Sequence, residues 1–277
     1  MLEYWLKRLC IVVSLCATGI AFAAPSSGDL SADEIVQQAV KRAQWAGDSN
    51  PQKEYNYEKT SIIEELDGQG RVKNRKEKLL QFQAGVGTLK ELKVNGKTAT
   101  LPEVKKQEAQ TTSDRQHLTQ KNTARRDDNW CQYLTRELTA RYNFSLVGQE
   151  NIGSRAAYVL KFEPKSDHLP VKEITDRLIN RLAGKIWIDA GQFEVAKAEI
   201  RLLDEVTMWG GVLGAMKKLY FNVERAPIDQ NVWVNQATKV ELEGRKLFDT
   251  MRMRIKSESG NFRKPVAFNC HATQIGS

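Results

Sequence analysis

The sequence has few of the residues that carry most enzyme chemistry. Histidine occurs only as His117, His168 and His271, and no HExxH or CxxC spacing is present. Zinc sites need several such ligands at short spacing, so we expect no metal. The nucleophile patterns GxSxG and SxxK are also missing. Together these absences favour a protein that is not an enzyme and that needs no cofactor.

Long apolar runs are missing except at the start of the chain. Residues 9–22 form one apolar run, preceded by the basic pair Lys7 and Arg8 and followed by a small-x-small site ending at Ala23. The run is short for a membrane span, and the pattern is typical of a secretory signal peptide over residues 1–23. An uncleaved membrane anchor is the alternative. We therefore expect a periplasmic protein with one domain over residues 24–277.

Acidic residues are fewer than basic ones. The chain has 42 Lys and Arg against 34 Asp and Glu, a formal net charge of +8. Such a surface attracts anionic partners such as lipid head groups, acidic proteins or nucleic acid. Export argues against nucleic acid, and the basic residues are spread widely enough for a solvated surface to explain most of them. We expect a monomer.

Cysteine is also scarce after the leader. Only Cys131 and Cys270 remain beyond residue 23. In an oxidising compartment they could form a disulfide, and two buried free thiols are the alternative, because the sequence does not give the distance between them. We expect the disulfide, which would tie a predicted helix to the C-terminal tail.

Alternating apolar and polar residues dominate the rest of the chain. The clearest case is 184–202, where Ile186 and Ile188 alternate with polar residues before a turn, and the alternation resumes through Ile200. Such a pattern predicts an antiparallel hairpin with one apolar and one wet face. Further strands are predicted over residues 54–66, 71–84, 87–94, 144–150, 155–163, 219–225, 231–243 and 247–258.

Helices are predicted at three places. Residues 31–46 carry an apolar stripe at helical spacing that ends at Trp45, and residues 130–141 and 171–183 carry shorter stripes. Residues 101–129 are polar and without periodicity, which predicts a solvated helix or a mobile insertion. A sheet of nine or ten strands curls, and its apolar face needs cover. The fold class is therefore mainly antiparallel β with helices (α+β), a half-open barrel with helices on its concave side.

Four stretches carry a resemblance to a known family. They are YNYEKTSIIEELDGQGRV, FSLVGQENIGSRAAYVLKFEP, GKIWIDAGQFEVAKAEIRL and NVWVNQATKVELEG. In this order they resemble exported bacterial proteins with the LolA-like fold, the group of the LolA and LolB lipoprotein carriers and of the N-terminal part of RseB-like regulators. The resemblance covers most of residues 33–258 and implies an unclosed β-barrel with an apolar concavity that holds acyl chains.

The resemblance implies a set of residues that line this concavity. Two groups are expected, one on the inner face of the strands and one in the apolar stretch 206–216. The first comprises Tyr158, Leu160, Ile186, Ile188 and Ile200, and the second Met208, Trp209, Val212, Leu213 and Met216. Stretch 206–216 is predicted to be either a lid, with hinges at Gly210, Gly211 and Gly214, or an ordinary core helix.

Two functions follow as the main hypotheses, and a hydrolase with an unrecognised site is a third. The first is a periplasmic carrier that binds an acyl chain or a lipidated protein in the concavity. The second is a regulatory or protein-interaction module of the RseB type that binds an envelope protein.

Overall fold

The computed structural model describes residues 30–109, 134–166, 168–172, 174–208, 214–246 and 249–265. The chain divides into residues 1–31 and 32–277, and every helix and strand given below belongs to the second unit. The predicted signal peptide over residues 1–23 and both members of the predicted disulfide, Cys131 and Cys270, lie outside the described residues.

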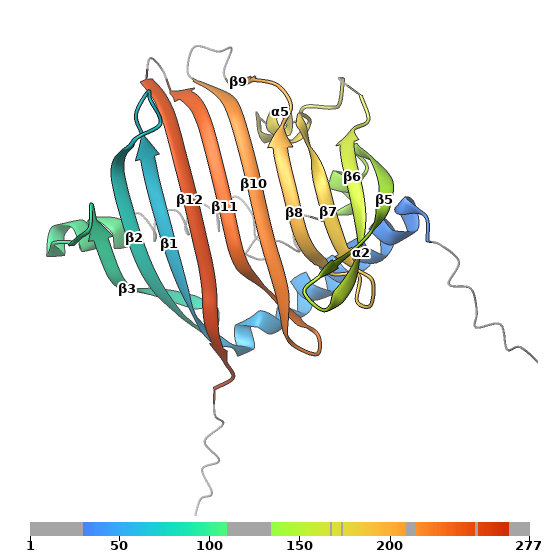
Figure 1. Ribbon diagram of the computed structural model, residues 1–277, viewed down its shortest axis with the longest axis horizontal. Coiled ribbons are helices and arrows are strands. Elements are labelled where there is room, and N and C mark those ends of the chain that lie inside the picture. Colours follow the sequence, from blue (N-terminus) through green and yellow to red (C-terminus); the bar gives the residue numbers. More distant parts are fainter. Residues whose placement is uncertain are drawn as a thin grey trace, which may run out of the picture. The chain divides into compact units, whose positions relative to one another are not determined.

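Most predicted elements are present, several of them longer than predicted (Figure 1). The helices are α2 (Ala32–Ser49), the 3-10 helix η1 (Pro51–Glu54), α4 (Arg136–Thr139) and α5 (Ile174–Ile179). The strands are β1 (Asn56–Leu66), β2 (Val72–Gln83), β3 (Val86–Val94), β4 (Lys97–Thr98), β5 (Tyr142–Ile152), β6 (Arg155–Pro164), β7 (Leu182–Asp189), β8 (Val195–Leu202), β9 (Val206–Met208), β10 (Gly214–Asp229), β11 (Val232–Lys246) and β12 (Asp249–Arg263). Residues 101–109, the start of the polar insertion, are helical.

The described strands form one twelve-stranded sheet. Its order is β4-β3-β2-β1-β12-β11-β10-β8-β7-β6-β5, with β9 added beside β10, and all pairs are antiparallel. The N-terminal hairpin joins the sheet through β1, which pairs with the last strand at Ile63 and Ile255. β4 and β5 form the two edges, so the sheet does not close. The open antiparallel half-barrel expected from the sequence is confirmed.

The strand register places one apolar row across the inner face of the sheet. From β1 to β5 the row contains Ile63, Ile255, Val240, Phe221, Ile200, Gly184, Phe162 and Phe144, each directly opposite the next. Gly184 leaves a gap in it between Ile200 and Phe162. A Cβ at Gly184 would lie 1.9 Å from the Glu199 carbonyl oxygen, so only glycine fits there.

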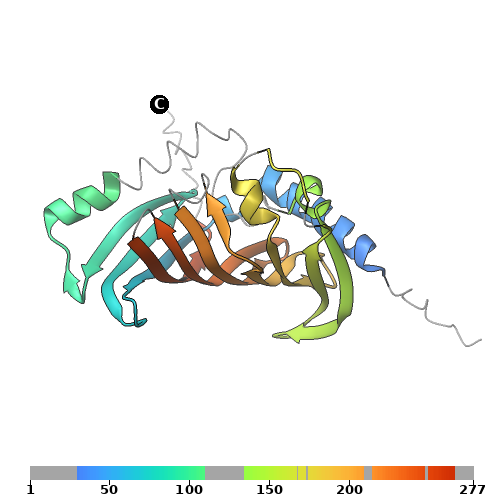
Figure 2. The same cartoon turned by 90° about the horizontal axis from the view of Figure 1, so that it is seen from above.

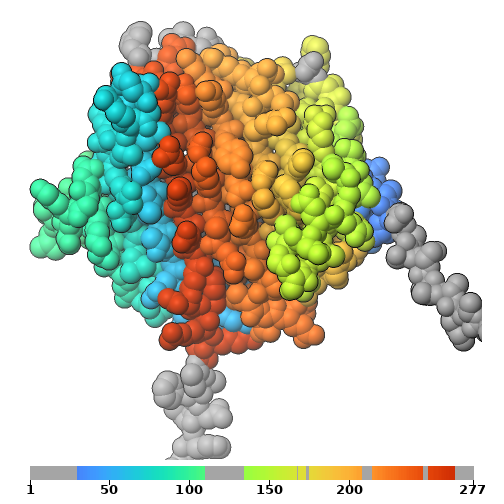
Figure 3. All heavy atoms as spheres, viewed as in Figure 1, coloured from blue at the N-terminus to red at the C-terminus, as the bar shows by residue number. Residues whose placement is uncertain are grey.

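The outer face of the sheet is charged at β1, β2 and β12. Glu64 accepts from Arg75 and from Arg254, both at 3.1 Å, and thereby links three neighbouring strands. Figure 3 shows this face, which the strands form without a helix in front of them. Charged side chains on a solvated face are the usual arrangement for an antiparallel sheet with one buried side.

The outer face is not wet everywhere, which corrects the expectation for hairpin 184–202. Trp187 is buried there against Ala157 and Val159, and its indole nitrogen donates to Glu150 at 2.8 Å. Glu150 lies near the end of β5, so the β5–β6 hairpin supplies the partners that bury β7 on its outer side. Trp187 occupies a position in the alternation that polar residues otherwise fill. The sequence pattern therefore did not reveal this second packed surface.

Helix α2 buries the apolar stripe from which it was predicted. Ile35, Val36, Ala39, Val40 and Ala43 are buried as predicted. Trp45 does not belong to this stripe, as it is 42% exposed and lies under the Arg42 guanidinium at 4.2 Å. Figure 2 shows α2 and α5 on the same side of the sheet.

The other two predicted helices are shorter than the sequence indicated. The helix predicted over 130–141 is present only as α4, where the Thr135 hydroxyl caps the helix by accepting from the Leu138 amide at 3.1 Å. Residues 130–133 lie outside the described part. Residues 140 and 141 form a turn, and strand β5 begins directly after them at Tyr142. The helix predicted over 171–183 is α5, and Leu182 already belongs to β7.

Candidate ligand-binding cavity

An apolar cavity lies between the inner face of the sheet and helices α4 and α5. Its volume is about 500 Å³, within the ~300–1,000 Å³ range of small-molecule sites. The apolar side chains that line it are Leu134, Leu138, Tyr142, Phe144, Phe162, Ile179, Leu182, Ile186, Ile200, Leu219 and Phe221. The polar ones are Lys59, Thr135, Thr139, Asn235, Thr238 and Ser257.

The cavity exists because the sheet curves. Its lining comes from β1, β12, β11, β10, β8, β7, β6 and β5, which are eight consecutive neighbours in the sheet. In a flat sheet these strands would span about 34 Å from first to last. One cavity of this size touches all of them only if the sheet bends around it. Figure 2 shows that the sheet is curved.

Helices α4 and α5 are held over the cavity by a polar cluster. Arg141, directly after α4, pairs with Asp176 of α5 at 3.0 Å and donates to the Asn180 side-chain oxygen at 2.7 Å. The Tyr142 hydroxyl donates to the Ile179 carbonyl at 2.5 Å. Burial raises the pKa of Tyr142 to about 12, so the phenol stays protonated and keeps donating to α5.

A buried ion pair fixes the bottom of the sheet to α2. Glu194, in the β7–β8 turn, pairs with Arg225 of β10 and accepts from Arg42 of α2 at 2.8 Å. Arg42 also donates to the Asn231 carbonyl in the β10–β11 turn at 2.7 Å. Charges with so little exposure are retained only when paired and hydrogen-bonded. Sequence reasoning missed these residues, because nothing in a single Glu or Arg marks it as buried.

The turn of the central hairpin carries a second ion pair, in which the carboxylate is buried and the arginine is partly exposed. The Arg155 guanidinium donates to both Asp189 oxygens, at 2.6 and 2.8 Å. Asp189 also accepts from the Gly191 and Gln192 amides, so it closes the turn that the sequence predicted. Asp189 and Glu194, the two carboxylates at this turn, are therefore structural.

The residues predicted to line the concavity fall into three groups. Ile186 and Ile200 line the cavity. Leu160 and Ile188 are on the same face of the sheet but are fully buried in the core, and Tyr158 stacks on Phe193. None of the latter three is among the lining residues. Phe144, Phe162 and Phe221 were missed, although their alternation in the sequence placed them on the same face.

The apolar stretch 206–216 is not a helix in its described parts. β9 pairs with β10 from Val206 opposite Met216 to Met208 opposite Gly214. Gly214 sits inside the sheet, where a Cβ would lie 2.9 Å from the Arg245 carbonyl oxygen. Residues 209–213, which are Trp209, Gly210, Gly211, Val212 and Leu213, lie outside the described residues.

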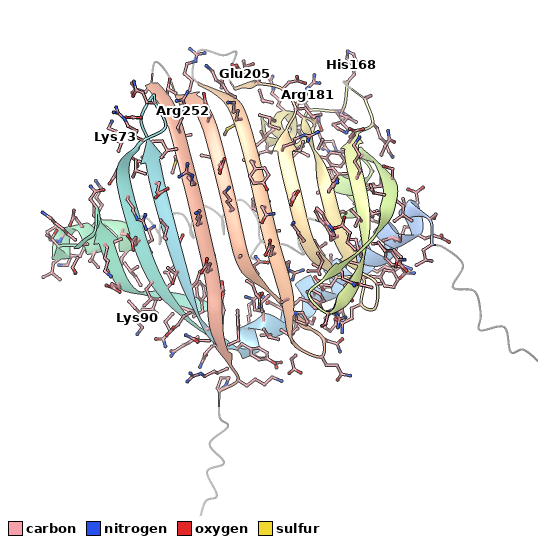
Figure 4. All side chains as sticks on the ribbon, viewed as in Figure 1. Lys73, Lys90, His168, Arg181, Glu205 and Arg252 are labelled. Atoms are coloured by element: carbon pink, nitrogen blue, oxygen red, sulfur yellow. The ribbon has the colours of Figure 1, made fainter. Side chains whose placement is uncertain are left out.

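The described residues contain no candidate site for a metal ion. None of their His, Cys, Asp and Glu side chains form a group of three or more that could hold one. His168, the one described histidine, lies on the loop before α5, and Figure 4 shows it at the upper rim of the sheet, far from Lys90. Among these residues no helix is both long and apolar enough to cross a membrane.

Comparison with known proteins gives only distant likenesses. No protein-family model matches the sequence, and no curated protein matches it. Among solved structures the chain is similar to a LolA superfamily protein from Nitrosomonas europaea, at 11% identity over 85% of this chain and 94% of that one, with a TM-score of 0.30. A domain from Vibrio parahaemolyticus assigned to outer membrane lipoprotein sorting is 10% identical over 84% and 94%, with a TM-score of 0.30. A chain of the Pseudomonas aeruginosa MucA/MucB complex is 11% identical in sequence, over 83% of this chain and 99% of that one, with a TM-score of 0.23.

The superpositions are loose, so the case for a function rests on the cavity of this chain.

Proposed function

We propose that this protein is a periplasmic, non-enzymatic carrier that binds an acyl chain or a lipidated protein in its apolar cavity. The observation that carries the proposal is the lining itself, where eleven apolar side chains surround about 500 Å³ on the inner face of a curved sheet. An apolar site that remains wet is unfavourable, at about 25 cal/mol per Å² of apolar surface. A flexible hydrocarbon chain suits a cavity with few polar groups.

The arrangement around the cavity supports binding more than reaction. The buried carboxylates Glu194 and Asp189 are each held by arginine, so both serve the fold. The cluster of Arg141, Asp176 and Tyr142 holds α4 and α5 against the sheet. We propose that the protein acts as a monomer, because one copy of the chain supplies all walls of the cavity. It needs no cofactor and no nucleic acid.

Lipid extraction tests this proposal directly. The protein is purified from the periplasm without detergent, and its organic extract is analysed by mass spectrometry. We expect acyl-containing molecules in stoichiometric amount. A protein that carries no lipid and binds no acyl probe contradicts the proposal, and stable association with a defined envelope protein would then favour a regulator of the RseB type.

A further inference from the structure

The two edges of the sheet differ in how well they are protected against further strand pairing. At one edge β4 is only two residues long, and β3 beside it carries Lys90, Glu91 and Lys93. Very short edge strands and charged side chains are the usual devices that keep an edge from pairing with another chain. The other edge is β5, which spans 11 residues and pairs only with β6 among the described strands. It has no charged residue from Tyr142 to Gln149.

The first half of β5 presents backbone groups along this open edge. The Lys165 amide donates to the Arg141 carbonyl at 2.9 Å, and this pair continues the register between β5 and β6. In an antiparallel pair every second residue bonds to the partner strand. The residues that alternate with the bonded ones therefore direct their N–H and C=O groups away from β6, and they are Tyr142, Phe144 and Leu146. The register shift after Leu146 ends this regular stretch.

A groove lies beside the start of β5. Its volume is about 680 Å³, and α2, α4 and the first residues of β5 form its walls. Its apolar lining residues are Val36, Val40, Ala140, Tyr142 and Phe144. Figure 2 shows α2 at the same end of the sheet as β5. A groove between a helix and an open strand edge is a place where an extended peptide can bind as an added strand.

The charged residues of this groove are mostly basic. Lys41, Arg136 and Lys165 line it, and Asp33 is the one carboxylate among its lining residues. All four residues are exposed. Exposed charges of one sign attract a partner of the opposite sign and disfavour one of the same sign. An acidic segment therefore matches the groove, whereas a second copy of this chain, with its formal net charge of +8, does not.

The edge also exposes two large apolar side chains. Leu146 is 40% and Val147 57% exposed. Side chains on adjacent strands pack in cross-strand pairs, and β-branched residues are well suited to such pairs. An occupant in which β-branched and acidic residues alternate would satisfy the apolar edge and the basic groove together.

We infer that β5 is a docking edge for a partner protein, which adds an extended segment of alternating acidic and β-branched residues, its carboxylates beside Lys41, Arg136 and Lys165. The added segment pairs with the outward backbone groups of β5. This interaction goes beyond the proposed acyl binding and does not depend on it, because none of the three cations lines the apolar cavity.

Two peptides of about ten residues, the upper end of usual strand lengths, test the inference. One alternates Val with Glu, and the other has Gln in place of every Glu. Each is titrated into isotope-labelled protein and followed by NMR, which also registers weak binding. The Glu peptide is expected to bind at least about fivefold tighter, since several exposed ion pairs together contribute about that factor.

Amide hydrogen exchange in the complex tests the strand pairing itself. Exchange at Phe144 and Leu146 is expected to slow when the Glu peptide binds, because both N–H groups then donate to the added strand. The Asn143 amide is the internal control. It belongs to the set that bonds to β6, so its exchange is expected to change little.

Charge variants assign the preference to the groove. Lys41→Gln combined with Arg136→Gln is expected to reduce the preference for the Glu peptide at least about threefold and to leave binding of the Gln peptide within about twofold. Lys161→Gln combined with Lys185→Gln is the matched control. These two lysines lie opposite each other on the outer face of β6 and β7, so their loss removes the same charge and is expected to keep the preference.

Every other outcome overturns the inference. Equal affinity for the two peptides, no binding of either, or an unchanged preference in the groove variant contradicts the charge match. Binding that leaves exchange at Phe144 and Leu146 unchanged excludes strand addition. Protection of these amides that rises with protein concentration, without peptide, indicates a second copy at this edge instead. None of these results bears on acyl binding, which is measured with lipid ligands.

Discussion

Glu194 and Arg225 form an ion pair in which both side chains are 2% exposed. Each belongs to a different part of the sheet, the β7–β8 turn and strand β10, and Arg42 of α2 reaches the same carboxylate. The pair thus holds the lower end of the sheet and the N-terminal helix in one arrangement. The cavity lies on the inner face of the same curved sheet.

Removal of the Glu194 charge should destabilise the fold strongly. In Glu194→Gln the buried Arg225 guanidinium loses its counterion, which costs about 3–5 kcal/mol. Glu199→Gln is the control, because its pair with Lys197 is on the outer face and is worth under about 1 kcal/mol. Urea denaturation of both variants measures the two losses. Similar losses would show that the Glu194 cluster is not a structural centre.

Gly184 should not tolerate even one added carbon. A Cβ there meets the Glu199 carbonyl oxygen at 1.9 Å, so Gly184→Ala must separate β7 from β8, at a cost above about 2 kcal/mol. Gly260→Ala in β12 is the control, since nothing lies within 4 Å of its Cβ position. Thermal unfolding gives both values. A Gly184→Ala protein as stable as Gly260→Ala would disprove the close approach of the two strands.

Stability should fall at alkaline pH through Tyr142. The pKa of Tyr142 is raised by burial to about 12, against about 10 in the unfolded chain. The folded state therefore holds this proton more tightly. The contribution of Tyr142, roughly 2–3 kcal/mol, is complete below pH 10 and is lost as the pH rises from 10 through 12.

The variant Tyr142→Phe isolates this effect. It removes the titrating group together with the bond to Ile179, so it should lose about 1 kcal/mol at pH 7 and show a shallower fall in stability above pH 10. Urea denaturation at pH 7, 9 and 11 provides the curve. An identical slope in wild type and Tyr142→Phe would mean that the phenol is not buried.

The sequence predicted the fold well because the sheet is built from local alternation. Thr238 to Leu242 and Met251 to Ile255 each follow the period of two that a strand with one buried face requires. Turns such as Asp67 to Gly70 marked where the strands reverse. The order of strands that are distant in the chain, such as β1 beside β12, depends on tertiary pairing that no local pattern encodes.

The site was predicted only in part, for a similar reason. Ile186 and Ile200 line the cavity, and alternation in the sequence indicates the inner face on which they lie. The sequence could not tell which inner residues border empty space and which, like Leu160, are fully packed. Nothing in the sequence indicated that Lys59 lines the cavity, since a lysine in a polar strand segment resembles a solvated one.

The central claim is that the cavity binds a hydrocarbon chain, and Ile200→Trp tests it most directly. Ile200 lines the cavity, so an indole there fills part of the 500 Å³ and competes with the ligand. Ile62→Trp adds the same ring to the outer face of β1 and serves as the control. The measurement is the Kd of dansyl-labelled undecanoic acid for wild type and both variants, with circular dichroism to show that each is folded. The account predicts a Kd at least about tenfold higher in Ile200→Trp and unchanged in Ile62→Trp, whereas equal affinity of a folded Ile200→Trp protein would contradict it.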